Sequence, residues 1–320
     1  MKKLLMNRKV VNGPYGGGNN FVKAVCEYAP QYGYEVIHSF RGNKGIESNI
    51  DAILLIDPRY DELGISIREI AAYKAKFPST KVIHRINECD KRKGTNDVDK
   101  LLVESSKVAD VGCFISEWIM NYFEEWHCPK RVVYSGANKE HFHPLNEDVK
   151  YFQKKLHNAL DAPINIVVHH WSNNIMKNKF THELDEWIGK NNKRYTFTYI
   201  GRSPDGLKNT IVIPPKWGKE LGELLGQYDV VVNSSLWDPC PNSLIESVSC
   251  SLPVFVYKDG GGGVEIVEKS KAGFVYDNFD HLVYMLESYT KEDYYNMSRN
   301  IGWITTWDAC MKTYFEIIDA

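Results

Sequence analysis

The sequence has no excess of charge of either sign, because 39 lysine and arginine residues face 41 aspartate and glutamate residues and leave a formal net charge of −2. This balance gives no whole-molecule electrostatic argument for binding nucleic acid or a membrane surface. Long apolar runs are lacking too, and no stretch approaches the roughly 20 residues of a membrane-spanning helix. The apolar part of residues 1–6 is too short for a signal peptide. We therefore expect a cytoplasmic protein with at most peripheral membrane contact.

Paired cysteines are also lacking. The seven cysteines are scattered, odd in number and without a C-x-x-C spacing, which favours free thiols in a reducing compartment over a disulfide framework. A chain of 320 residues can bury roughly three quarters of its unfolded surface, so its core needs neither a disulfide nor a structural metal.

Two nucleotide-binding fingerprints are missing from the glycine-rich stretch at residues 13–20, GPYGGGNN. It has neither the G-x-G-x-x-G spacing of dinucleotide-binding proteins nor the Lys-Ser/Thr of a P-loop. Clustered glycines nevertheless let backbone N–H groups approach a ligand, and a helix follows. Gly17 and Gly18 are therefore candidates for binding a phosphate or a sugar, although a tight turn without a ligand explains the stretch equally well.

Apolar, β-branched segments alternate with amphipathic helical segments along the whole chain. The expected strands are residues 4–11, 35–40, 52–56, 81–86, 111–115, 131–134, 164–168, 195–200, 210–213, 229–232, 254–257 and 273–276. The expected helices are residues 21–32, 67–77, 98–108, 117–126, 180–189, 219–225, 243–250 and 264–269. This alternation predicts an α/β protein with parallel sheets covered on both faces. A polar break at residues 144–163 divides it into two doubly wound, Rossmann-like domains.

An apolar stripe in residues 303–318 predicts a last helix. We expect this helix to pack on the rest of the molecule, with a surface for a partner protein as the alternative.

The stretch from Asp238 to Glu246 places two carboxylates eight positions apart around the start of an expected helix. The free N–H groups and the dipole of a helix N-terminus favour negative charge by roughly 0.3–2 kcal/mol. A phosphate bound there would leave the carboxylates free to bind hydroxyls, and a nucleotide sugar carries both groups. The spacing of Ser243 and Glu246 is also that of a capping box, in which Glu246 would bond only its own helix. Glu246 lies off the apolar stripe of the helix, however, which favours a position facing solvent or a cleft.

Other polar residues follow the expected strands at the sheet edge where doubly wound proteins bind ligands. His84 and Arg85 close one strand, and Asn87 and Asp90 come after it. These groups can bond hydroxyls or stabilise a leaving phosphate. The alternative is an Arg85 that pairs with Glu88 or Asp90.

A second polar group, His169-His170-Trp171-Ser172, follows the strand at 164–168, and Lys177 comes close enough in sequence to reach a phosphate. Adjacent residues of a strand point to opposite faces, so we do not expect the two histidines to bind one zinc ion. The four glycines at 260–263 come after another strand and are a candidate ligand loop, or else a hinge.

Together these motifs resemble the GT-B glycosyltransferases of the large retaining family 4. Asp238-x7-Glu246 resembles the Glu-x7-Glu motif of that family, and Ser-Leu-Pro-Val at 251–254 resembles its Gly-Leu-Pro-Val. Residues 134–144, YSGANKEHFHP, are similar to its Asn-Gly-Val-Asp…Phe-x-Pro segment, and Gly260–Gly263 with Glu265 resembles its Gly-Gly-x-x-Glu loop. The final aromatic helix is similar to the one that crosses back onto the first domain.

The resemblance implies roles for these residues. Glu246 would bind the ribose hydroxyls of a nucleotide and Asp238 the donor sugar. Lys177 would hold the diphosphate together with backbone N–H groups of Asn242, Ser243 and the loop with Gly17 and Gly18. His84 would lie beside the transferred sugar as the second catalytic residue. His170 and Ser172 would lie on the phosphate side. Arg85, Asn87 and Asp90 are guesses for the acceptor side, as are the loops 57–60 and 90–96.

Three departures from the family pattern bear on specificity. The first motif acid is Asp238 rather than Glu, His170-Trp171-Ser172 replaces the Gly-Arg that precedes the lysine, and Asn178 replaces a glycine after it. The sugar therefore stays open.

From this resemblance we expect an acceptor-side domain at residues 1–150, a donor-side domain at 151–302 with the active site in the cleft between them, and a C-terminal helix at 303–320. The expected activity moves a sugar from a nucleotide diphosphate sugar, of UDP or GDP, to a hydroxyl of a carbohydrate or lipid-linked acceptor, with retention of configuration and without a metal or other cofactor. The alternatives are a nucleotide-sugar epimerase or hydrolase, or a sugar- or nucleotide-binding protein without catalytic activity.

Overall fold

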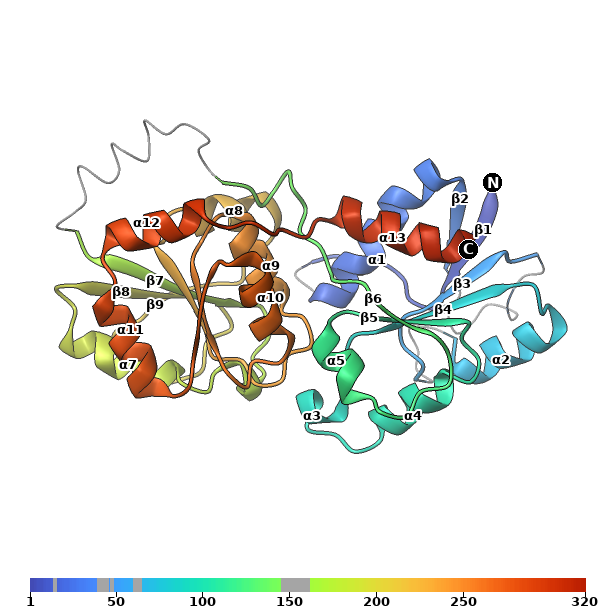
Figure 1. Cartoon of the computed structure of the whole chain (residues 1–320), viewed down its shortest axis with the longest axis horizontal. Helices are drawn as coiled ribbons and strands as arrows, with labels where there is room; N and C mark the ends of the chain where they lie inside the picture. The colour runs from blue at the N-terminus through green and yellow to red at the C-terminus, as the bar shows by residue number, and fades with distance from the viewer. Residues whose placement is uncertain (14–15, 39–45, 47–48, 60–64, 145–161) are drawn as a thin grey trace. The chain divides into compact units, whose positions relative to one another are not determined.

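Each half of the chain builds a six-stranded, all-parallel sheet (Figure 1). The computed structural model describes residues 1–13, 16–38, 46, 49–59, 65–144 and 162–320. The chain divides into two units, the first formed by Met1–Ser135 with Trp307–Ala320 and the second by Gly136–Thr306. The domain boundary predicted at residue 150 lies outside the described residues. The α/β class with two parallel sheets is confirmed.

In the first unit the strand order is β2-β1-β3-β4-β5-β6. The strands are β1 (Lys2–Met6), β2 (Tyr34–His38), β3 (Ala52–Leu55), β4 (Lys81–Ile86), β5 (Val111–Phe114) and β6 (Lys130–Val132). Successive side chains point to opposite faces, so Leu4 and Met6 pack in one core and Leu5 in another. The helical elements are α1 (Gly17–Tyr28), η1 (Ala29–Tyr32), α2 (Ile67–Lys76), α3 (Asp90–Lys93), α4 (Val98–Ser105), α5 (Glu117–Tyr122) and α13 (Trp307–Asp319).

In the second unit the strand order is β12-β11-β10-β7-β8-β9. The strands are β7 (Ile164–His170), β8 (Tyr195–Gly201), β9 (Ile211–Ile213), β10 (Val230–Asn233), β11 (Val254–Tyr257) and β12 (Gly273–Tyr276). The helical elements are η2 (Ile175–Lys177), α7 (Thr181–Lys190), α8 (Gly218–Leu225), α9 (Asn242–Ser249), α10 (Gly262–Ser270), α11 (Phe279–Ser288) and α12 (Lys291–Arg299).

Each sheet contains one point where the strand order reverses. In the first sheet the chain proceeds from β1 outward to β2 and then returns to β3, on the other side of β1. In the second sheet it proceeds from β7 to β8 and β9 and returns to β10, beside β7. Because the connections at such a point leave in opposite directions, the carboxyl ends of the two strands border a crevice, which is where open α/β sheets bind ligands.

The C-terminal helix α13 belongs to the first unit and packs on α1. Tyr314 lies against Phe21 of α1 with ring centroids 4.9 Å apart, and Phe315 stacks on Tyr32 at 4.4 Å. The end of the helix is tied to β2 by a hydrogen bond of 2.8 Å from the Tyr34 hydroxyl to Asp319. The predicted packing of this helix is therefore confirmed.

Several predicted boundaries differ from the structure for identifiable reasons. The strand expected at 4–11 ends at Met6, because the Asn7 side chain turns to accept a hydrogen bond of 2.8 Å from the Ile56 N–H. The helix expected at 117–126 ends at Tyr122, and Trp126 packs against Phe114. Helices α3, α11 and α12 were not predicted at all. The end of the strand expected at 35–40 lies outside the described residues.

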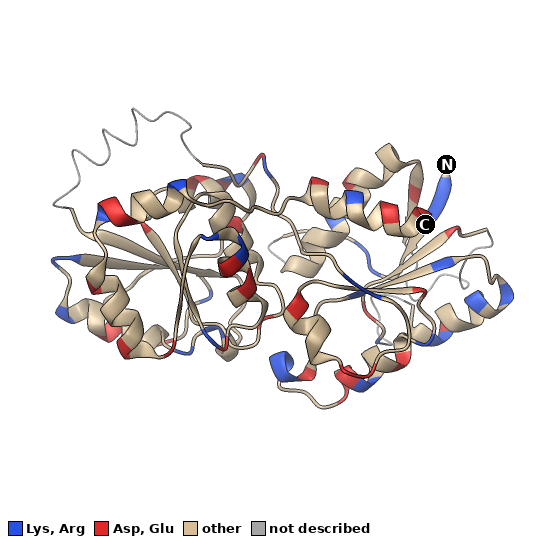
Figure 2. Ribbon diagram, viewed as in Figure 1, with Lys and Arg blue, Asp and Glu red and all other residues tan. Residues whose placement is uncertain are grey.

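Acidic and basic residues are interspersed over the helices of both units (Figure 2), so the small net charge does not hide a separation into an acidic and a basic half. Among the described residues, no helix has the length and apolar character needed to span a bilayer.

The packing of α13 gives a first test. Met311 is fully buried in the core beneath α13, whereas Lys312 beside it is exposed. We expect Met311→Ala to lower the free energy of unfolding of the first unit by about 2–5 kcal/mol, through lost burial and the cavity left behind. Lys312→Ala is the matched control and should change it by less than about 0.5 kcal/mol. Urea unfolding of both variants measures the difference, and equal effects would show that α13 does not complete this core.

Candidate functional site

The predicted donor-side residues gather at the reversal point of the second sheet. Lys177 ends the short turn η2 after β7, and Asp238 lies in the loop after β10. The Lys177 ammonium donates to an Asp238 carboxylate oxygen across 3.0 Å, with both side chains largely buried. Sixty-one positions apart in the chain, these residues meet because β7 and β10 are neighbours.

The backbone aligns the two loops that carry this ion pair. The Leu236 N–H donates to the Met176 carbonyl at 2.6 Å, and Asn178 forms a parallel bridge with Ser234. The turn before Lys177 is fixed by the Asn174 side chain, which accepts from the Met176 N–H at 2.9 Å. Lys177 is therefore held by a strand-like contact rather than by its ion pair alone.

The four-glycine loop supports Asp238 from the other side. Gly260–Gly263 is buried, and the Gly262 N–H donates to the Asp238 carbonyl at 2.9 Å. Gly261 has φ +69°, and a Cβ atom there would lie 2.6 Å from that carbonyl oxygen. The loop therefore packs directly against the backbone of Asp238, and only glycine fits at position 261. Its predicted role as a ligand loop or a hinge stays a prediction.

Glu246 does not form the capping box that its spacing allows. Helix α9 begins at Asn242 with Pro241 as its N-cap and has no side-chain cap, so Ser243 lies within the first turn. The Ser243 hydroxyl has no hydrogen-bond partner among the described residues. Glu246 is free of this local role, and its side chain, 14% exposed, faces the end of β7.

Burial gives Glu246 unusual acid–base properties. Removal from water disfavours the charged carboxylate and raises the pKa of Glu246 to about 8, although the Lys177 ammonium opposes the change. At neutral pH the carboxyl of the ligand-free protein therefore carries a proton. A protonated carboxyl donates one hydrogen bond and accepts others, which suits a pair of vicinal hydroxyls.

His169 supports this arrangement and was not among the predicted site residues. Its Nε2 lies 2.9 Å from the Ser243 carbonyl oxygen and 2.8 Å from the Ser247 hydroxyl. A carbonyl only accepts, so Nε2 carries the proton and Nδ1 presents a lone pair toward Glu246, 4.0 Å away. Burial lowers the pKa of His169 to about 4, which keeps the ring neutral. The sequence held a signal for His169, because successive side chains of a strand point to opposite faces and only one of His169 and His170 can face α9.

The remaining donor-side candidates lie around this group. Asn242 is the first residue of α9, and Ser243 offers its carbonyl to His169. Ser172 accepts from the Asn174 N–H at 3.2 Å and so shapes the turn before Lys177. His170 points to the opposite face, where its buried ring lies edge-on to Tyr199 with centroids 6.2 Å apart. The roles predicted for these four residues toward a nucleotide stay predictions.

In the first unit, His84 and Arg85 are buried on opposite faces of β4. His84 has no exposed surface and lies beside Trp126, with ring centroids 6.0 Å apart, and burial lowers the pKa of the His84 ring to about 3. The Arg85 guanidinium lies 4.3 Å from the Phe21 ring centroid and donates to the Ser135 hydroxyl at 3.1 Å. It is not paired with Glu88 or Asp90, because it points under α1. Arg85 thus has a role in the core, and the sugar contact of His84 and the acceptor contact of Arg85 stay predictions.

The glycine-rich stretch begins α1, with Gly16 as the N-cap and Gly17 and Gly18 in the first turn. A Cβ atom on Gly18 would lie 3.8 Å from the side-chain nitrogen of Asn87. The Asn19 side chain anchors the preceding loop by two hydrogen bonds of 2.8 Å to the Val11 backbone. Residues 14–15 of this stretch lie outside the described residues.

Asp90 has a structural role at the start of α3. Its carboxylate accepts from the Val98 N–H at 3.1 Å and from the Asp99 N–H at 3.0 Å, so that it closes the 90–99 loop. In the part of the chain that the structure describes, no three His, Cys, Asp or Glu side chains gather as a metal site.

The close approach of the glycine loop gives a second test. We expect Gly261→Ala to destabilise the second unit by about 2–4 kcal/mol, because it adds a backbone clash to the strain of a positive φ. Gly206, with φ +84° and its nearest neighbour atom 3.9 Å from a built Cβ, is the matched control. Gly206→Ala should cost only about 1 kcal/mol. If urea unfolding gives equal losses, the loop moves away from Asp238 at no cost.

The burial of Glu246 gives a third test, on pH. The folded protein holds the Glu246 proton up to about pH 8, whereas the unfolded chain releases it near 4.5. Between these values the folded state binds more protons, so this group stabilises the protein below pH 4.5 and the contribution is lost as pH rises to 8. From pH 5 to 9, the free energy of unfolding of the wild type should therefore fall relative to that of Glu246→Gln. The fall should be about 1.4 kcal/mol for each unit by which the pKa of Glu246 in the folded protein exceeds its pKa in the unfolded chain.

Urea unfolding of both proteins at several pH values measures this change. The opposite contribution of His169 is common to the two proteins and cancels in the comparison. Parallel curves would mean that Glu246 is ionised in the folded protein.

Comparisons with known proteins bear on the same region. Residues 187–302 match the family model of the glycosyl transferases group 1, which spans both Asp238 and Glu246. No curated protein is similar to this chain in sequence.

Solved structures match the whole chain. The sucrose-phosphate synthase of Thermosynechococcus elongatus is 12% identical, with a TM-score of 0.71 over 100% of this chain and 98% of that one. HepE of Anabaena in complex with UDP is 13% identical, with a TM-score of 0.69 over 100% of both chains, and another HepE structure holds UDP-glucose. The catalytic domain of starch synthase IV from Arabidopsis thaliana, bound to ADP and acarbose, is 9% identical, with a TM-score of 0.66 over 99% and 98%.

At such identities the likeness to solved structures shows the fold alone, and the sequence match covers residues 187–302 of the second unit. The chain carries a glycosyl transferases group 1 domain and has the GT-B fold of glycosyltransferases over its full length.

Proposed function

We propose that this protein is a retaining glycosyltransferase that moves a sugar from a nucleotide diphosphate sugar to a hydroxyl of a glycan, lipid-linked or small-molecule acceptor. The observation that carries the proposal is the Lys177–Asp238 ion pair beside Glu246 at the reversal point of the second sheet. It combines a cation for phosphate, a carboxylate for sugar hydroxyls and a protonated carboxyl for ribose, within one group 1 domain.

The proposed donor complex requires Lys177 to change partner. A diphosphate carries more charge than a carboxylate and would draw the Lys177 ammonium from Asp238, with support from the free N–H groups at the start of α9. Asp238 would then be available to accept hydrogen bonds from the donor sugar. Glu246, whose carboxyl lies 4.0 Å from Nδ1 of His169, would bind the ribose hydroxyls.

The proposed reaction passes through an oxocarbenium-like transition state, as at other glycosidic centres. As the bond to the sugar breaks, negative charge grows on the leaving diphosphate, and Lys177 would stabilise it. An acceptor hydroxyl would attack from the same face of the sugar that the diphosphate leaves, which retains the anomeric configuration. UDP is supported as the nucleotide by HepE, whose structures hold UDP and UDP-glucose, and GDP is the alternative.

Nucleotide binding tests the proposal. We expect UDP or GDP at about 100 times its dissociation constant to stabilise the wild type by about 2.7 kcal/mol in a thermal unfolding assay. Lys177→Met should weaken the binding of that nucleotide at least about tenfold, since it removes a charge-assisted bond. Lys190→Met, at the end of α7, is the control and should bind as the wild type does.

Turnover separates the proposal from its alternatives. The glucose conjugate of the stabilising nucleotide should be consumed slowly alone and faster with an acceptor, and NMR of the product should show the anomeric configuration of the donor. Asp238→Asn should abolish transfer while nucleotide affinity changes little. Turnover that no acceptor accelerates would instead indicate a hydrolase or an epimerase, and the absence of any nucleotide binding would overturn the proposal.

A further inference from the structure

An aromatic side chain and a cation lie together beside the donor-side residues of the second unit. Trp171 follows β7, and Arg202 follows β8, the neighbouring strand of the sheet. The Cζ atom of Arg202 lies 5.5 Å from the centroid of the Trp171 ring. The indole is 38% exposed, and Arg202 is exposed as well. An exposed indole with a guanidinium beside it is a surface on which a planar aromatic ligand can stack.

The backbone of the two strand ends fixes the position of this pair. His170 faces Gly201 in the parallel ladder, and the Arg202 N–H donates to the His170 carbonyl at 3.2 Å. Trp171 and Arg202 therefore form the next pair along the ladder. Gly201 has φ +137°, and a Cβ atom there would lie 1.8 Å from the His170 carbonyl oxygen. The two strand ends approach this closely only because residue 201 is glycine.

Trp171 continues the face of the sheet that carries His169. Successive side chains of a strand point to opposite faces, so residues 169 and 171 share one face. His169 bonds the first turns of α9 on that face, and its Nδ1 lies 4.0 Å from the Glu246 carboxyl. Two residues of a strand span roughly 7 Å. Trp171 therefore follows His169 at a distance comparable to the length of a nucleoside.

The order of the strands gives a bound nucleotide its direction. Lys177 pairs with Asp238, which follows β10 on one side of β7, whereas Arg202 follows β8 on the other side. The base and the phosphate are attached at opposite ends of a ribose ring. A nucleotide with its diphosphate at Lys177 and its ribose at Glu246 therefore directs its base toward the end of β8.

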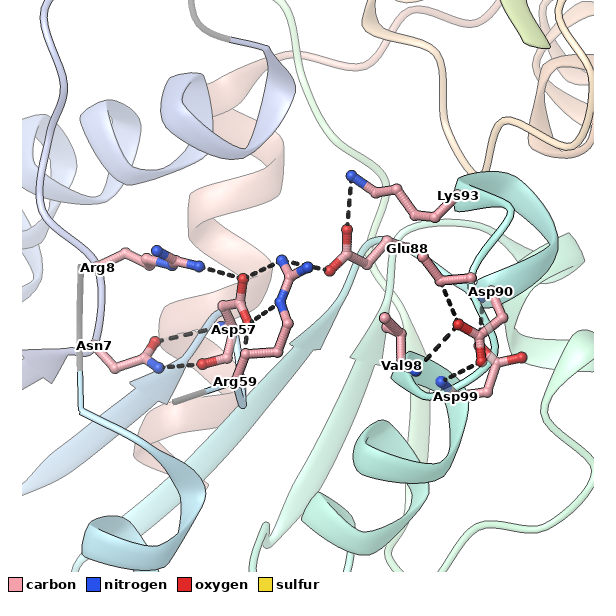
Figure 3. Close-up of polar contacts among 10 residues, drawn as sticks. Asn7, Arg8, Asp57, Arg59, Glu88, Asp90, Lys93, Val98 and Asp99 are labelled. Atoms are coloured by element: carbon pink, nitrogen blue, oxygen red, sulfur yellow. Dashed lines mark hydrogen bonds and ion pairs between the residues drawn. The ribbon is translucent and has the colours of Figure 1, made fainter. Parts of the chain in front are cut away.

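The Arg202 guanidinium has hydrogen-bond donors to offer. In the first unit the charged side chains after the strands are paired with one another, and Arg59 lies between Asp57 and Glu88 (Figure 3). Arg202 differs: among the described residues its guanidinium makes no hydrogen bond or ion pair, and Asp205 of the same loop is not its partner. A guanidinium donates five hydrogen bonds and accepts none, so it selects ligand groups that accept.

We infer that Trp171 and Arg202 bind the base of the donor nucleotide, which stacks on the indole and accepts a hydrogen bond from the guanidinium. The inference rests on the proposed glycosyltransferase function, because it completes the nucleotide that Lys177 and Glu246 would hold. It favours a donor with a carbonyl group on its base, uracil or guanine. Cytosine and adenine carry an amino group at the corresponding position, and an amino group cannot accept from arginine.

Matched nucleotides test this selection by calorimetric titration of the wild type. UDP and CDP differ by a carbonyl or an amino group at one ring position, and GDP and ADP provide the purine pair. Inorganic pyrophosphate, which has no base, reports on the phosphate side alone. We expect the carbonyl base to bind at least about tenfold more tightly than its amino counterpart in one pair or both.

Variants of the pair locate the selection. Trp171→Leu should weaken binding of every nucleotide about tenfold through the lost stacking, and Trp171→Phe should restore most of it. Arg202→Met should reduce the preference for the carbonyl base to less than about threefold. Arg194→Met is the matched control, because Arg194 is also exposed and lies 5.3 Å from an aromatic ring, that of Tyr195, but at the opposite end of β8.

Pyrophosphate should bind all four variants as it binds the wild type, which also shows that they are folded. The inference is wrong if CDP and ADP bind as well as UDP and GDP, or if Arg202→Met and Arg194→Met behave alike. It is equally wrong if Trp171→Leu weakens pyrophosphate as much as it weakens nucleotides, since the pair would then act on the phosphates. A wild type that binds no nucleotide at all would overturn the glycosyltransferase proposal as well.

Discussion

The ion pair between Lys177 and Asp238 links the loops that follow β7 and β10, the neighbouring strands between which the strand order of the second sheet reverses. A largely buried ion pair is weak evidence for stability, because the loss of hydration offsets most of the attraction between the charges. The loops that carry it are already aligned by backbone contacts and by the glycine loop, so the pair is not needed to hold them. In the function that we propose, the pair matters through an exchange, in which an incoming diphosphate replaces the Asp238 carboxylate as the partner of Lys177.

The two reversal points share a construction but differ in charge. In the second unit Lys177 pairs with Asp238, and burial raises the pKa of the neighbouring Glu246 to about 8. In the first unit Asp57 pairs with Arg8 and Arg59, and Glu88 pairs with Arg59 and Lys93. The same topology therefore carries a lysine–aspartate pair beside a buried carboxyl in one unit and a network of paired charges in the other. Fold alone does not fix what a site binds, and here the difference comes from a few side chains after the strands.

The sequence predicted most strands and the existence of both sheets, because apolar β-branched runs and their alternation with helices are local signals. It also predicted that Asp238 and Lys177 follow strands and that Glu246 lies near the start of a helix, and the structure brings these three residues together. It did not predict that Glu246 would leave its capping box, which depends on Pro241 rather than Ser243 ending the loop. Nor did it predict the contacts of His169, since its partners Ser243 and Ser247 lie 74 and 78 positions away in the chain. His84 and Arg85 were predicted to face a ligand at the end of their strand, but both side chains are buried in the structure. A polar residue at a strand end is therefore not always exposed.

The packing of α13 has a consequence for how the protein is made. The core beneath α1, with Phe21 and Tyr34, is covered by residues 307–319, which the ribosome delivers only after the whole second unit. Throughout that interval the nascent first unit exposes an apolar face that the finished protein conceals. Such a face invites chaperones and non-native association. We therefore regard the first unit as a fold that is completed last, although its strands are synthesised first.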